Sequence, residues 1–114
     1  FPYTTLFRSE VLDKNVSPKD KKEALDISRV LLEDRLIACS NIIDGAMSVY
    51  RWNGETVTDT EVVAVMKSRA ELFSKILKKI KELHSYEIPS VSMVELKDIN
   101  QTFGDWIAES VRLD

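Results

Sequence analysis

The chain contains one histidine and one cysteine, and these are the residue types best suited to binding copper or to nucleophilic chemistry. His84 lies in the segment ELHSYEIPS, two residues before Tyr86, and Cys39 lies in LIACSNII. Imidazole and thiolate are both good copper ligands. His84 therefore has three interpretations: a metal or ligand contact, an acid–base catalyst, or a helix cap whose ring bonds the last free carbonyl groups.

Catalysis needs more groups than this pair supplies. A thiol beside His84 could be an activated nucleophile, but no oxyanion hole or orienting carboxylate stands at a recognisable spacing. Cys39 has a second interpretation as a small apolar residue in a central strand. Lys67 ends an apolar strand, where it either reaches solvent or supplies the positive charge of an anion-binding cleft. We expect no enzymatic activity.

Two aromatic residues, Tyr50 and Trp52, alternate along a predicted strand and so face the same side of it. Aromatic residues in this arrangement pack either in the core or between subunits.

The composition of the chain restricts the class of protein to which it can belong. The chain has 114 residues, 44% hydrophobic and 31% charged, with a net charge of −3. These values are typical of one ordinary globular domain and argue against nucleic-acid binding. No apolar run reaches the ~20 residues of a membrane span. A single cysteine excludes an intrachain disulfide and suits a reducing compartment, so we expect a cytoplasmic protein.

Hydrophobic periodicity predicts the elements that must position these side chains. Four extended segments and three helices follow one another along the chain, at 10–17 (weak strand), 18–35 (helix), 36–52 (strand), 61–68 (strand), 68–84 (helix), 91–96 (strand) and a last helix capped by Asn100. The order β-α-β-β-α-β-α predicts an α+β, ferredoxin-like βαββαβ sandwich with an extra C-terminal helix. Its antiparallel sheet carries helices on one face.

Local signals set the predicted boundaries. Ser68 and Glu71 form an S-x-x-E capping box that opens the second long helix. Asp44-Gly45 indicates either a bulge in one long strand or a hairpin, whereas Asn53-Gly54 is a stronger hairpin signal. The segment EVVAVMKS is apolar at nearly every position, which predicts a strand covered on both faces.

The first residues have a separate interpretation. FPYTTLFRS can be encoded by TTT CCC TAC ACG ACG CTC TTC CGA TCT, which resembles a widely used sequencing-adapter oligonucleotide. We therefore interpret residues 1–9 as a non-native, adapter-derived extension and residues 10–114 as the single domain. Because YTTLF has good β propensity, we also expect these residues to be recruited, at least in part, as a surrogate first strand.

The longer motifs resemble the CutA family. They are LLEDRLIACSNIIDGAMSVYRWNGE, EVVAVMKSRAELF, IKELHSYEIPS and FGDWIAESV, which together cover most of the chain. The resemblance implies a ferredoxin-like protomer in a tight homotrimer, associated with tolerance of divalent metal ions, notably copper, and with no established catalytic activity. An architecture like that of the PII signalling proteins implies an alternative role in small-molecule sensing without metal binding.

The resemblance also implies where a ligand binds. It points to inter-subunit clefts occupied by a metal ion or a small anionic ligand, lined by Cys39, Tyr50, Trp52, Lys67, Tyr86 and Trp106. His84 and Cys39 are the candidate metal ligands. Family positions that often carry a further cysteine and a second histidine hold Asn15 and Leu83 here. We therefore expect no required cofactor and only weak binding of copper or another divalent cation.

Overall fold

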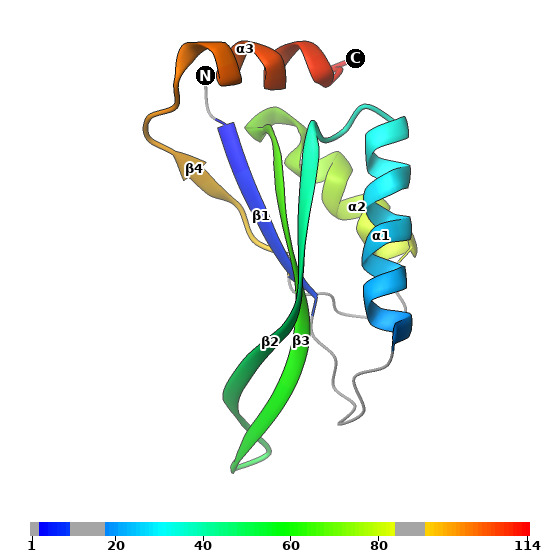
Figure 1. Cartoon of the computed structure of the whole chain (residues 1–114), viewed down its shortest axis with the longest axis vertical. Coiled ribbons are helices and arrows are strands. Elements are labelled where there is room, and N and C mark those ends of the chain that lie inside the picture. The colour runs from blue at the N-terminus through cyan, green and yellow to red at the C-terminus, as the bar shows by residue number, and fades with distance from the viewer. Residues whose placement is uncertain (1–2, 10–17, 84–90) are drawn as a thin grey trace.

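The computed structural model describes residues 3–9, 18–83 and 91–114 (Figure 1). Its elements are β1 (Tyr3–Ser9), α1 (Pro18–Glu33), β2 (Cys39–Trp52), β3 (Glu55–Arg69), η1 (Ala70–Leu72), α2 (Phe73–Leu83), β4 (Val94–Leu96) and α3 (Gln101–Ser110). The strands form one four-stranded sheet in the order β2-β3-β1-β4, and each neighbouring pair is antiparallel. This arrangement confirms the predicted ferredoxin-like α+β fold.

The strand next to β4 is built from the segment that we interpret as adapter-derived. β1 lies between β3 and β4, with Tyr3 opposite Arg69 on one side and Leu96 on the other. Within the described residues β4 pairs with β1 alone, so β1 is the only strand that joins β4 to the sheet. The surrogate-strand expectation therefore agrees with the structure. The weak strand predicted at 10–17 lies outside the described residues.

β2 and β3 form a long antiparallel ribbon. Of the two alternatives at Asp44-Gly45, the structure has the bulge: Ile43 pairs with Val63 and Ala46 with Glu61, so two residues oppose one. Gly45 has φ of 79°, a conformation that costs glycine little because it lacks a Cβ. The predicted hairpin at Asn53-Gly54 is present, and both residues have positive φ.

The hydrophobic core lies between one face of the sheet and the helices α1 and α2, with α3 closing the end of the sheet (Figure 1). Fully buried side chains come from each layer: Leu31 of α1, Met66 of β3, Ile76 and Ile80 of α2, and Ile107 of α3. A fully buried aliphatic side chain of this size contributes about 1.5–3 kcal/mol. This core holds the inner part of the ribbon.

Within the described residues of one chain, β3 is covered on one face, whereas the sequence predicted cover on both. Ala64, Met66 and Ser68 are buried, but Val63 and Val65, which alternate with them along the strand, are only half-buried. The helices cover one face, and within the described residues the other face of the sheet carries no helix (Figure 1). An apolar run in the sequence indicates which residues are hydrophobic, but it does not indicate which neighbouring elements cover them. The strand predicted from residue 36 begins later, at Cys39. It lies at the edge of the sheet, so the central position predicted for Cys39 was wrong.

The first helix ends before the predicted Arg35. Leu36 N–H donates to the Leu31 carbonyl at 2.9 Å and Arg35 N–H to the Leu32 carbonyl at 3.1 Å, the bonding pattern of a Schellman motif. Arg35 has φ of 59° at the position that usually holds glycine. The sequence predicted a helix that continues to Arg35, because no glycine at this position indicates where the helix ends.

The predicted capping box at Ser68 was also wrong. Ser68 belongs to β3, is fully buried, and donates its hydroxyl to the Leu36 carbonyl at 2.6 Å. Glu71 instead pairs with Arg69 at 2.8 Å. The turn η1 precedes α2, and Arg69 is its N-cap residue without a side-chain cap hydrogen bond. A buried serine that donates to the loop before β2 has the same local sequence as a capping serine.

The C-terminal elements follow the prediction with shorter bounds. The strand expected at 91–96 covers only Val94–Leu96, and Asn100 is the N-cap residue of α3 but makes no side-chain cap bond. Within the described part of the chain, no helix is long and apolar enough to cross a membrane.

Candidate functional site

Cys39 and Lys67 are direct cross-strand partners at the inner end of the ribbon. Directly opposite residues in an antiparallel pair lie on the same face of the sheet, with Cβ atoms about 4.5–5.5 Å apart. The buried neighbours Met66 and Ser68 lie on the opposite, helix-covered face, so Cys39 and Lys67 face the side without helices. Both are half-buried. The strand register thus places two residues that lie 28 positions apart in sequence, Cys39 and Lys67, opposite each other on one face of the sheet.

Tyr50 and Trp52 lie far from this pair within one chain. They belong to the last three residues of β2, next to the hairpin, and Trp52 is 55% exposed. Cys39 and Tyr50 lie eleven positions apart along the extended strand, which corresponds to roughly 35 Å. The longest dimension of the chain is 44 Å. Two of the predicted cleft residues are therefore at one end of the molecule and two at the other.

Trp106 lies on α3, which crosses the end of the sheet where β2 begins (Figure 1). Its ring stacks on Phe103 with centroids 5.6 Å apart and an interplanar angle of 13°. It remains 44% exposed. Trp106 therefore lies at the same end of the sheet as Cys39 and Lys67, and opposite to Trp52.

The predicted residues His84 and Tyr86 lie outside the described residues, so the pairing of His84 with Cys39 stays a prediction. Within the described ranges 3–9, 18–83 and 91–114, no group of three or more His, Cys, Asp or Glu side chains could hold a metal ion. The copper site proposed from the sequence is not built from the described residues alone.

A second polar site was missed by the sequence analysis. Asp59 and Glu61 of β3 are buried, at 7% and 4% exposure. Farther along the same strand the buried positions are Val62, Ala64 and Met66, so the buried side of β3 changes at the bulge. The run TDTE is typical of an exposed polar hairpin. Only its β-branched threonines indicated a strand continuing through it.

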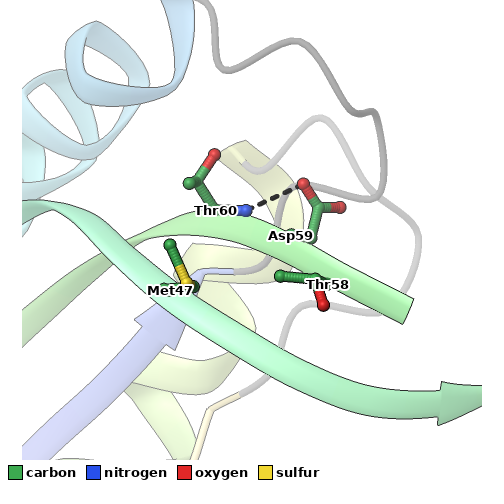
Figure 2. Close-up of a pocket in the computed structure, with 4 residues that line it drawn as sticks. All are labelled: Met47, Thr58, Asp59 and Thr60. Atoms are coloured by element: carbon green, nitrogen blue, oxygen red, sulfur yellow. Dashed lines mark hydrogen bonds between the residues drawn. The ribbon is translucent and has the colours of Figure 1, made fainter. Parts of the chain in front are cut away.

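Asp59 borders a cavity of about 190 Å³, lined also by Met47, Thr58 and Thr60 (Figure 2). Asp59 Oδ1 accepts a hydrogen bond from the Thr60 backbone N–H at 2.8 Å. Asp59 Oδ2 is inaccessible to solvent and has no hydrogen-bond partner among the described residues. A buried carboxylate oxygen is thus left without a donor.

The fold and these sites define a class: a small ferredoxin-like domain with a long β-ribbon, an uncovered sheet face and a polar pair at its inner end. A family model described as CutA1 divalent ion tolerance protein matches residues 15–110. The chain therefore belongs to the CutA1 family, which confirms the resemblance seen in the sequence. It is 36% identical over 101 residues to the divalent-cation tolerance protein CutA of Thermotoga maritima, covering 89% of this chain and 98% of that protein.

Solved structures extend the comparison to the first strand. CutA1 from Oryza sativa matches with a TM-score of 0.84 and 26% identity, covering 99% of this chain and 96% of that one. The divalent cation tolerance protein from Thermus thermophilus matches with a TM-score of 0.81 and 29% identity, covering 98% of this chain and 100% of that one. β1 thus lies outside the family match by sequence, which begins at residue 15, and within the structural match.

Proposed function

We propose that this chain serves the tolerance of divalent metal ions, as a homotrimer whose inter-subunit clefts bind an ion or a small ligand. Its relatives from Thermotoga maritima and Thermus thermophilus carry the description divalent-cation tolerance protein. The observation that carries the proposal is the separation of the predicted cleft residues. One end of the β2–β3 ribbon carries Cys39 and Lys67, and the hairpin end carries Tyr50 and Trp52. A cleft that contains all four residues therefore requires more than one chain.

The surface of β2 supports assembly. β2 is an edge strand of the sheet, and it exposes the large apolar side chains Ile43, Met47, Val49 and Trp52. An exposed, long and apolar edge strand is an aggregation hazard unless another strand or subunit covers it. Burial between protomers would remove that hazard and leave Trp52 as an aromatic anchor.

Metal binding is proposed to be weak, with copper or another divalent cation held by His84 and by Cys39 where assembly brings them together. Asn15 and Leu83 stand where further ligands are expected, so few soft ligands are available. Isothermal titration of the reduced protein with copper, on wild type and His84→Ala, tests this. We expect weak binding that the substitution abolishes. A submicromolar site that survives the substitution would place the ligands elsewhere.

Native mass spectrometry with and without added copper tests assembly and binding together. A trimer that takes up copper supports both parts of the proposal, whereas a monomer at micromolar concentration contradicts the assembly. The proposed location is the cytoplasm, although a solved relative from Archaeoglobus fulgidus, with a TM-score of 0.79 and 29% identity, is described as periplasmic.

Lys67 favours a second candidate, the sensing of a small anionic ligand without metal. Lys67 forms no ion pair with another described residue, and it is the cross-strand partner of Cys39 on the sheet face without helices. An unpaired ammonium group can attract a carboxylate or phosphate. Copper-independent binding of an anion that Lys67→Gln abolishes would favour this candidate over the metal role.

A further inference from the structure

β1 fills an inner position of the sheet, although its sequence lies outside the family match, which begins at residue 15 (Figure 1). It pairs with β3 from Tyr3 opposite Arg69 to Ser9 opposite Val62, and with β4 from Tyr3 to Thr5. The match to solved CutA1 structures nevertheless includes this strand. The fold therefore fills this position with a segment that the sequence pattern of the family does not match.

We define the space between β3 and β4 as the strand slot. Its walls are residues 62–69 of β3 and Val94–Leu96 of β4. Each wall also contacts other parts of the molecule: β3 pairs with β2 and buries Met66 completely, and Leu96 packs against the hydrophobic core. Because adjacent strands are about 4.8 Å apart, the walls are separated by roughly 10 Å, which is the space for one strand. Residues outside β1 thus define the slot.

The register of β1 shows that the slot does not require one fixed set of side-chain contacts. Tyr3 to Leu6 follow one register with β3, whereas Arg8 and Ser9 follow another that differs by one residue. A one-residue shift reverses the face of the sheet on which side chains lie relative to the partner strand. β1 stays paired with β3 on both sides of this shift. The pairing therefore rests on main-chain hydrogen bonds, as it does where a protein binds an extended peptide by adding it to a sheet.

An empty slot would leave main-chain donors and acceptors of two strands unpaired inside the sheet. Each such group costs free energy comparable to a lost hydrogen bond, and an unpaired strand edge attracts another strand. We propose that the strand slot is a binding site for an extended peptide segment, which it recognises by its main-chain groups and can accept from outside its own chain. The segment needs seven residues, the length of β1, and no proline where it pairs. This site does not depend on the proposed role in metal tolerance.

The test uses the full chain with its own β1 disabled. In a strand that is paired on both sides, successive residues direct their N–H groups to opposite neighbours. The double substitution Thr4→Pro, Thr5→Pro therefore removes one donor toward β3 and one toward β4. The matched control is Thr4→Val, Thr5→Val, which changes the same two residues but keeps both N–H groups and a high β propensity.

Three fluorescein-labelled synthetic peptides are the probes. The first has the sequence YTTLFRS of residues 3–9. The second contains the same seven residues in a shuffled order, so it keeps the main-chain groups and changes the side-chain order. The third is YTTLFRS with methylated main-chain nitrogens at its two threonines, so it keeps the side chains and loses one donor toward each wall. Fluorescence anisotropy measures binding, and circular dichroism measures the thermal transition.

We expect the first two peptides to bind the proline variant saturably, with Kd values within about tenfold of each other, and the methylated peptide to bind at least about tenfold more weakly. Wild type and the valine control should bind the first peptide at least about tenfold more weakly than the proline variant does, because their own β1 competes at the ~mM effective concentration of a tethered segment. If the proline variant is unfolded alone, the first two peptides should restore a cooperative transition.

Three results would overturn the proposal. One is the absence of both binding and a restored transition in the proline variant at millimolar YTTLFRS. Another is equal binding of the methylated and unmethylated peptides, because the peptide would then attach without the main-chain pairing of the slot. The third is binding of YTTLFRS without binding of the shuffled peptide, because the slot would then recognise side chains.

Discussion

The inner and outer halves of the β2–β3 ribbon belong to the same two strands but are stabilised differently. We define the inner half as 39–43 paired with 63–67, and the outer half as 46–52 paired with 55–61. The inner half packs one face on α1 and α2 through fully buried residues such as Met66. The outer half extends beyond these helices (Figure 1) and exposes Met47, Val49 and Trp52.

This difference shows that backbone pairing and side-chain burial are separable. The antiparallel register runs through both halves with one bulge between them, so hydrogen bonding alone does not distinguish them. Apolar burial does, since a helix layer covers only the inner half. The inner half is therefore stabilised by its own chain, whereas we expect the outer half to depend on other copies.

The largest effect should follow deletion of residues 1–9, which removes the strand between β3 and β4. β4 then loses its only partner strand within the described residues, and β3 loses the pairing with β1 that flanks the inner half. We expect loss of most of the ~5–15 kcal/mol typical of a domain, seen as loss of a cooperative thermal transition by circular dichroism. Replacing 3–9 with an unrelated strand-forming segment of equal length should restore folding. An unchanged Tm after the deletion would contradict a structural role for β1.

Two isoleucines allow a matched comparison of covered and uncovered positions. Ile76 of α2 is 0% exposed, whereas Ile43, beside the bulge, is 53% exposed. Ile76→Ala should lower the free energy of unfolding by about 2–5 kcal/mol, because it leaves a cavity in the core. Ile43→Ala should cost less than about 1 kcal/mol in the dissociated chain. Urea denaturation of both variants at several protein concentrations measures this, and equal losses in dilute protein would remove the distinction.

The outer half is tested by Trp52→Ala. If Trp52 is an interface anchor, the substitution should weaken assembly by about 2–4 kcal/mol and leave the far-ultraviolet circular dichroism spectrum unchanged. Sedimentation equilibrium measures the association constant, and Trp52→Phe should recover part of it because it keeps an aromatic ring. Association equal to that of the wild type in Trp52→Ala would show that the outer half does not contact another copy through this residue.

The smallest expected effect is a stabilisation at the end of α1, just before the inner half begins. Arg35 holds φ of 59°, a conformation that costs a residue with a side chain roughly 1 kcal/mol. Arg35→Gly should therefore raise the free energy of unfolding by up to about 1 kcal/mol. Arg29→Gly, in the interior of the same helix, should lower it by a similar amount. Thermal melts of both variants report the two signs, and a lower Tm for Arg35→Gly would contradict the strain.

Local sequence patterns determine the element order and with it the fold class. Helical periodicity, the Asn53-Gly54 turn and the alternation of strands and helices act within a few residues of one another, so they are legible in the linear chain. The motifs around Cys39 and His84 likewise indicate the family, because each is a contiguous run of residues. These signals are short-range, which is why the ferredoxin-like topology could be predicted.

The features that depend on what covers each residue follow from tertiary structure. Ser68 donates to the Leu36 carbonyl in the loop before β2 instead of capping a helix, and Asp59 is buried although its neighbours are polar. The placement of Cys39 opposite Lys67, and of Tyr50 roughly 35 Å away, follows from strand register over many residues. Coverage and register are long-range properties, because they depend on residues distant in the chain that meet only when the sheet forms. Local patterns therefore establish which elements exist, whereas the assembled sheet establishes which of their side chains meet, which are buried and which stay exposed.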